Sequence, residues 1–160
     1  IKKKIKIAYY SGIRTSRAAE YFKQVFFKNY RYKIEIQQIK SKLIQKYDLL
    51  VLLYPFHAFN ALKTVYNCIS QLKNVDNIPA VIISVSDGEK IIPNTACGEV
   101  QLKELKKRYK VIYEKMLVMP LNVLITRMKI YLDAFRDFAQ ESFHDRNDFE
   151  KKLYDVNIGL

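Results

Sequence analysis

The chain has 160 residues, of which 49% are hydrophobic and 13% aromatic, and it carries a formal net charge of +12. This length and apolar content predict one folded domain, residues 1–160, and exclude an intrinsically disordered chain. No stretch reaches the roughly 18 apolar residues of a membrane span, and two cysteines are too few for a disulfide framework. The apolar run after the basic residues 2–4 is too short for a signal peptide, so we expect a cytoplasmic protein.

The 28 basic residues outnumber the 16 acidic ones, which raises the question of a nucleic-acid partner. The lysines are spread along the whole chain, at intervals that fit the solvated faces of strands and helices. A nucleic-acid-binding protein would carry its excess charge as a patch, so we do not expect nucleic acid as a partner. His57 and His144 are the only histidines, and no spaced ligand cluster predicts a metal site.

Strands and helices alternate along the chain. The apolar run at residues 4–10 is a strand that ends in a turn, and residues 49–54 form an unbroken apolar run, typical of a central parallel strand. The full set of predicted strands is 4–10, 30–36, 49–54, 80–85 and 111–119. Helices are expected at residues 15–28, 41–46, 60–72, 95–109 and 123–143. Residues 145–160 form a charged, weakly patterned C-terminal tail.

This alternation predicts parallel pairing through right-handed crossovers. The expected fold is therefore α/β: a doubly wound five-stranded parallel sheet of order 2-1-3-4-5, with helices on both faces. In such sheets ligands bind beyond the carboxyl ends of the strands, at the switch point between strands 1 and 3. Three loops converge there, at residues 11–16, 55–60 and 86–97.

The first loop gathers hydroxyl groups and a glycine at the start of a helix. It consists of Ser11, Gly12, Ile13, Arg14, Thr15 and Ser16. Helix N-termini present N–H groups and the positive end of the helix dipole, so a phosphate binds there readily. Thr15 is the expected N-cap. The same residues also fit a capped helix whose serines are merely solvated, and the sequence leaves that alternative open.

The second and third loops follow buried strands. The second is aromatic and consists of Pro55, Phe56, His57, Ala58, Phe59 and Asn60. A flat ring could stack on Phe56 or His57, or these aromatics could pack beneath a neighbouring loop. The third loop is polar, and its candidate binding residues are Ser86, Asp87, Gly88, Asn94, Thr95, Ala96 and Cys97. Cys97 lies near a predicted helix N-terminus, but we interpret it as inert, and no catalytic side chain is predicted.

Six segments of the chain carry a resemblance to a known family. They are residues 7–12 (IAYYSG), 54–61 (YPFHAFNA) and 93–98 (PNTACG), together with 19–20, 47–51 and 109–120. Over about residues 4–122 the chain resembles the flavodoxins, in particular flavodoxin domains that some anaerobes join to a C-terminal ferredoxin module. The resemblance implies FMN as cofactor, with its phosphate in the first loop and its ring beside the second and third. It implies electron transfer or a small flavin-dependent reductase.

The resemblance further implies a redox partner protein, for example a ferredoxin-like one, or a small-molecule electron acceptor. No cysteine-rich segment follows, so we expect no fused ferredoxin in this chain. A receiver domain of two-component signalling has the same strand order, but it needs acidic residues where this chain has Tyr9 and Tyr10, and Tyr54 and Pro55.

The first loop departs from the Ser-Gly-Thr-Gly-Asn-Thr pattern of flavodoxins. It is one residue short, and Ile13 replaces a glycine that tolerates more backbone conformations. Arg14 either compensates with a charge-assisted contact or faces solvent. The alternative function is therefore a flavodoxin-like domain with a degenerate phosphate loop that has lost flavin and acts as a binding module. Whether the protein is an enzyme stays open.

Overall fold

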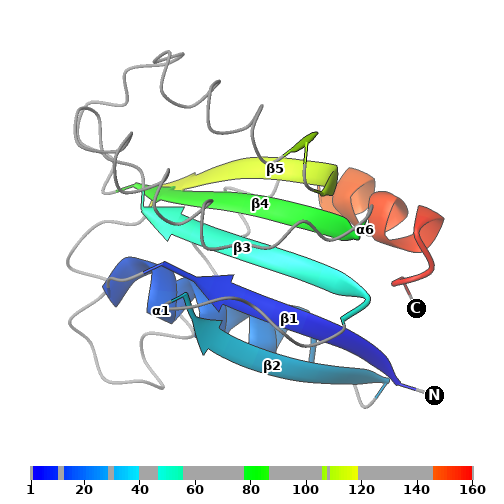
Figure 1. The fold of residues 1–160 in the computed structure, drawn as a ribbon, viewed down its shortest axis with the longest axis horizontal. Helices are drawn as coiled ribbons and strands as arrows, with labels where there is room; N and C mark the ends of the chain where they lie inside the picture. The colour runs from blue at the N-terminus through cyan, green and yellow to red at the C-terminus, as the bar shows by residue number, and fades with distance from the viewer. Residues whose placement is uncertain are drawn as a thin grey trace.

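The computed structural model describes residues 2–10, 13–28, 31–39, 47–55, 78–86, 106–107, 109–118 and 146–159. Within them lie β1 (Lys3–Tyr9), α1 (Ile13–Tyr21), the π-helical turn η1 (Phe22–Phe26), β2 (Tyr32–Gln38), β3 (Leu49–Pro55), β4 (Pro79–Ser86), β5 (Lys110–Val118) and α6 (Arg146–Asp155). All neighbouring strands pair in parallel, in the order β2-β1-β3-β4-β5 (Figure 1). The predicted doubly wound sheet is confirmed.

One face of the sheet packs against α1, η1 and α6. Alternate residues of a strand point to the same face, which places Ile5 and Ile7 of β1 beside Val51 of β3 and Ile83 of β4, all buried. Ala18 and Ala19 of α1 are fully buried against them, and such small side chains let the helix approach the sheet closely. This face carries the larger part of the described core.

The opposite face of the sheet is buried as well. Its core consists of strand residues that alternate with those of the first face, and of residues just before or after the strands: Ala8, Ile39, Tyr47, Leu50, Leu52, Tyr54, Ala80, Ile82 and Tyr109. Burial on both faces explains why residues 49–54 and 80–85 form unbroken apolar runs rather than alternating ones. β2 lies at the edge of the sheet and alternates half-buried with exposed residues from Tyr32 to Ile36, as predicted for a more exposed strand.

The helix after β1 changes character at its end, where η1 continues α1. The N–H of Phe27 donates to the carbonyl of Phe22 at 2.8 Å, a bond that spans five residues. At roughly 100° per residue, an α-helix would point these two side chains about 140° apart. The wider π turn brings both into the core, where Phe22 is 0% and Phe27 is 1% exposed. At α-helical spacing Phe22 falls on the same face as Ala18 and Ala19, whereas Phe27 does not fall on the same face as Phe22.

The C-terminal segment, expected to be a weakly patterned tail, contains α6 and packs on the sheet. The side chains of Phe149, Leu153 and Ile158 are buried in the same core as α1. Asn157 adopts a left-handed conformation with φ 63°, and the N–H of Ile158 then donates to the carbonyl of Leu153 at 2.9 Å. Only one apolar pair at helical spacing, Phe149 and Leu153, faces the core, which is why the sequence pattern is weak.

A bulge in β5 helps to seat α6. Ala80 of β4 pairs with Val111, but the next residue of β4 pairs with Tyr113, so Ile112 is an extra residue in the ladder. Val111 therefore packs on one face of the sheet while Tyr113 turns to the other. There its ring stacks on Phe149, with 4.3 Å between the ring centroids.

The strand boundaries differ from the predicted ones by at most two residues. β2 shows the largest shift, since it starts at Tyr32 rather than at residue 30. The helices predicted at residues 41–46, 60–72 and 123–143 lie outside the described residues, as does most of the one at 95–109. In the described part of the chain, no helix is long and apolar enough to cross a membrane.

Candidate functional site

The carboxyl ends of β1, β3 and β4 lie level with one another and form one edge of the sheet, which we call the carboxyl edge. Register pairs Tyr9 with Leu53, and Tyr54 with Ser84. The N–H of Tyr10 extends this ladder by donating to the carbonyl of Leu53 at 2.9 Å. The chain therefore leaves β1, β3 and β4 at one place, which is where the three predicted loops begin.

The turn from β1 into α1 is short and closed by its own hydrogen bond. The hydroxyl of Thr15 donates to the carbonyl of Tyr10 at 2.6 Å, and Thr15 is fully buried. On the other side of β1, the N–H of Ile39 donates to the carbonyl of Tyr9 at 2.8 Å. The end of β1 is thus fixed from both neighbouring strands, and the start of α1 is tied to it.

The prediction of Thr15 as N-cap is wrong. α1 begins at Ile13, so Thr15 lies in the first helical turn, and its hydroxyl closes the turn instead of capping an N–H group. A hydroxyl has a single proton to donate, and that of Thr15 goes to Tyr10. Thr15 therefore holds the backbone of this turn, and its hydroxyl proton is not available to a ligand there.

The start of α1 has the electrostatic character of an anion site. The first N–H groups of an α-helix lack carbonyl partners within the helix, and the helix dipole makes this end positive. No acidic residue lies in the first turn of α1, and Arg14 does. Ile13 has helical backbone, and among the described residues other than glycine only Asn157 has a positive φ, so Ile13 carries no strain of that kind.

The structure brings together the bases of the three loops but describes only part of the loops themselves. Of the predicted site residues, Ile13 to Ser16 belong to α1, while Pro55 ends β3 and Ser86 ends β4. The other predicted residues lie outside the described residues: Ser11, Gly12, Phe56, His57, Ala58, Phe59, Asn60, Asp87, Gly88, Asn94, Thr95, Ala96 and Cys97. Their proposed contacts with a phosphate or a ring remain predictions.

Two polar side chains near the carboxyl edge were not among the predicted site residues. Tyr54 and Ser84 are register partners on neighbouring strands, and they are 7% and 6% exposed. Both point to the face of the sheet that also holds Leu52 and Ile82, two residues nearer the strand starts. A serine within the apolar run of β4 was the available signal, because a buried hydroxyl requires a hydrogen-bond partner.

No protein-family model and no curated protein matches this chain. Among the described residues, no group of three or more His, Cys, Asp or Glu side chains could hold a metal ion. What the described geometry offers is a positive, carboxylate-free helix start at the switch point of a parallel sheet. That arrangement can bind a phosphate group and orient whatever is attached to it toward the ends of β3 and β4.

Proposed function

We propose that the protein binds FMN and serves in electron transfer or as a small flavin-dependent reductase. The observation that carries the proposal is the start of α1 beside the ends of β1 and β3, in a parallel sheet of order β2-β1-β3-β4-β5. Sheets of this order bind their ligand at that switch point, and FMN is the ligand in flavodoxins. The flavin, when bound, supplies the redox chemistry, while the protein binds it and tunes its potential.

The chain's own residues would act on the phosphate end through backbone and charge. The N–H groups at the start of α1 would donate to phosphate oxygens, and Arg14 adds positive charge in the same turn. The bond from Thr15 to Tyr10 would hold these donors in place before the ligand arrives. The resemblance of the second and third loops to flavodoxins supports a place for the ring beside residues 56–60 and 87–97.

The test compares FMN with riboflavin, which lacks the phosphate, by titrating each with protein and following flavin fluorescence. We expect saturable one-to-one quenching by the wild-type protein, with FMN bound more tightly than riboflavin. In Arg14→Glu a carboxylate enters the first turn of α1 and repels the phosphate. This variant should therefore lose FMN affinity by about tenfold or more while keeping its riboflavin affinity.

Lys28→Glu is the matched control, because it makes the same charge change just beyond η1, at the other end of the same helical segment. It should leave FMN affinity within about threefold of wild type. Glutamate near a helix N-terminus is favourable for the helix, so unfolding of Arg14→Glu is not expected. Absence of saturable quenching by folded wild-type protein would overturn the proposal.

The second candidate is a binding module that has lost flavin. The commitment of the Thr15 proton to Tyr10 favours it, because one hydroxyl donor of the expected phosphate loop is used within the protein. The start of α1 at Ile13 leaves a short turn after β1, and this also favours the second candidate. A folded, colourless protein that neither FMN nor riboflavin saturates would exclude the first function and leave this second one.

A further inference from the structure

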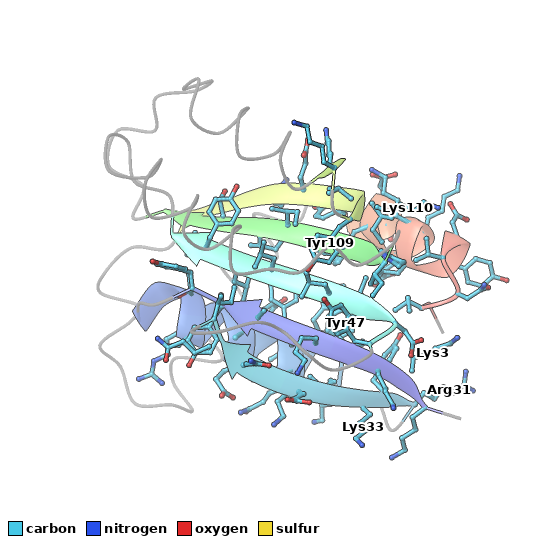
Figure 2. The ribbon with its side chains drawn as sticks, in the orientation of Figure 1. Lys3, Arg31, Lys33, Tyr47, Tyr109 and Lys110 are labelled. Atoms are coloured by element: carbon cyan, nitrogen blue, oxygen red, sulfur yellow. The ribbon has the colours of Figure 1, made fainter. Side chains whose placement is uncertain are left out.

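Basic residues that are far apart in sequence meet at the amino-terminal end of the sheet. We call this set the basic edge; it consists of Lys2, Lys3, Lys4, Arg31, Lys33 and Lys110, all exposed. Lys3 and Lys33 belong to the starts of β1 and β2, and Lys110 is the first residue of β5. Figure 2 shows Lys3, Arg31, Lys33 and Lys110 at the same end of the strands. Parallel pairing alone produces this cluster, since it aligns all strand starts.

The basic edge holds little opposite charge. At the strand starts and the described residues just before them, Asp48 is the only carboxylate, and its Oδ2 accepts the backbone N–H of Lys4 at 2.7 Å. Within the described part of the chain, the side chains of Lys3, Lys33 and Lys110 make no ion pair. α6 has three basic and three acidic residues, so it does not neutralise this end.

This arrangement costs stability. Lys4 and Lys33 are register partners on adjacent strands, so their side chains leave the same face of the sheet side by side. Like charges placed directly opposite each other in a sheet are destabilising. Lys6, two residues further along β1, is instead paired within the fold. Its Nζ lies 2.7 Å from Glu35 Oε1, and its side chain is only 2% exposed. Lys3, Lys33 and Lys110 have no such carboxylate among the described residues and are available to a partner from outside.

The chemistry of the basic edge favours a phosphate backbone over a protein partner. Protein interfaces have an apolar centre and are depleted in lysine. The aromatic rings at the described strand starts are occupied within the fold: Tyr47 and Tyr109 are buried with 3.3 Å between their hydroxyl oxygens, and the Tyr32 hydroxyl donates to the carbonyl of Ile158 at 2.7 Å. The exposed ring of Tyr154 belongs to α6 and not to a strand start. Single-stranded nucleic acid is bound largely by stacking on exposed aromatics, and the described strand starts carry no exposed aromatic ring.

Contrary to the expectation from the sequence, we propose that the basic edge binds the backbone of double-helical DNA without reading its sequence, because strand register brings lysines that are spread along the chain to one edge of the sheet. From β2 to β5 the edge spans four strand spacings, about 19 Å at roughly 4.8 Å each. A duplex presents one phosphate charge about every 1.7 Å along its axis, so several phosphates lie within reach of this span. The carboxyl edge is roughly 20 Å away along β1, at about 3.3 Å per residue, so this site is separate from the proposed flavin site.

The experiment measures anisotropy of a fluorescein-labelled duplex of arbitrary sequence, at salt concentrations between about 50 and 200 mM. The test variant is Lys33→Gln/Lys110→Gln, which removes a cation from each end of the basic edge. The control is Lys23→Gln/Lys151→Gln, which removes the same charge from exposed positions on η1 and α6. Thermal unfolding of each variant reports whether the fold is intact.

We expect wild-type protein to bind the duplex with an affinity that falls steeply with salt. The edge variant should bind at least about tenfold more weakly, with a salt slope shallower by roughly 1.8, about 0.9 for each phosphate that the protein no longer neutralises. The control should stay within about threefold of wild type. The proposal is overturned if the duplex does not bind, if both variants lose affinity equally, or if single-stranded RNA or polyglutamate binds more tightly than the duplex.

Discussion

Hydrogen bonds between distant residues hold both ends of the sheet, but at the carboxyl edge a local hydrogen bond also closes the turn into α1. At the carboxyl edge, the hydrogen bond from Thr15 to Tyr10 joins residues five positions apart. At the opposite end, the bond from the Lys4 N–H to Asp48 spans 44 positions, the pair of Tyr47 and Tyr109 spans 62, and the bond from Tyr32 to Ile158 spans 126. The proposed ligand turn is therefore closed locally, whereas the basic edge exists only after the whole sheet has assembled.

The two ends also differ in how positive charge arises. At the carboxyl edge it comes from the backbone at the start of α1, in a first turn without carboxylates. At the basic edge it comes from side chains of three different strands and the residues beside them. A backbone dipole suits one compact anion, and a row of lysines suits an extended polyanion. We therefore expect substitutions at one end to leave the ligand of the other end unaffected.

The largest effect on stability is expected from Glu35→Gln, between the two ends. Lys6 is buried, with its Nζ 2.7 Å from Glu35 Oε1 and 3.1 Å from Gln37 Oε1. Loss of the carboxylate should lower the free energy of unfolding by about 2–3 kcal/mol, less than for a fully buried pair because Glu35 is half exposed. Urea denaturation measures this change.

The control for this prediction is the double variant Lys6→Met/Glu35→Gln, which removes the buried charge together with its partner. Methionine fills a space similar to that of the lysine stem, so part of the stability should return. A double variant at least as unstable as Glu35→Gln would show that the ion pair is not what stabilises this position.

The next largest effect is expected from Thr15→Val at the carboxyl edge. Valine keeps the shape of the side chain but leaves the carbonyl of Tyr10 without this donor, at a cost of about 1–2 kcal/mol. Thr15→Ser retains the hydroxyl and should lose less. The measurement is the urea midpoint, with amide hydrogen exchange in the first turn of α1 as a local readout. Equal losses in the two variants would mean that packing, not the hydrogen bond, closes the turn.

A smaller effect is expected from Tyr47→Phe at the opposite end. This substitution removes the hydrogen bond between the hydroxyls of Tyr47 and Tyr109, worth roughly 0.5–1.5 kcal/mol. Tyr109→Phe is the matched variant, and a double-mutant cycle gives the coupling between the two hydroxyls. Additive losses, with no coupling, would show that the two hydroxyls do not interact in solution.

The smallest effect concerns alkaline pH. Burial raises the pKa of Tyr47 above its ordinary value of about 10, and the hydrogen bond with Tyr109 partly opposes this rise. The neutral form is therefore favoured in the folded state. The contribution of neutral Tyr47 to the stability of the fold is complete below pH 10, and it is lost as the pH rises through the pKa of Tyr47 in the folded state. Thermal unfolding from neutral to alkaline pH should show a shallower loss in Tyr47→Phe than in wild type, and identical profiles would contradict this.

The strands and their order were predictable because the signals are local. Unbroken apolar runs at residues 49–54 and 80–85 and the alternation in β2 depend on a period of two residues, which neighbouring side chains already display. The position of the candidate site, beyond the ends of β1 and β3, follows from the strand order. The predicted residues 56–60 and 87–97 lie outside the described residues, so their contacts stay predictions. The role of Thr15 was not, because a hydroxyl near a helix start fits both an N-cap and a bond to the preceding turn.

Other features could not be predicted from the sequence for physical reasons. α6 has a single apolar pair at helical spacing, and its packing against Tyr113 depends on a bulge in β5. Phe27 is buried by a π turn, whose period differs from the α-helical one used to predict inner residues. Lys6 was grouped with solvated lysines, and only its register with Glu35 shows that it is buried and paired.

The sequence by itself determined that this chain forms a parallel sheet with a helix start beyond β1, because hydrophobic period and turn residues act over a few positions. Only the tertiary structure decided which charges are buried and which meet at one end of the sheet. Lys3, Lys33 and Lys110 are up to 107 positions apart by their residue numbers, and strand register alone brings them to the same edge of the sheet. Local pattern fixes the elements, while alignment of the elements creates both candidate binding surfaces.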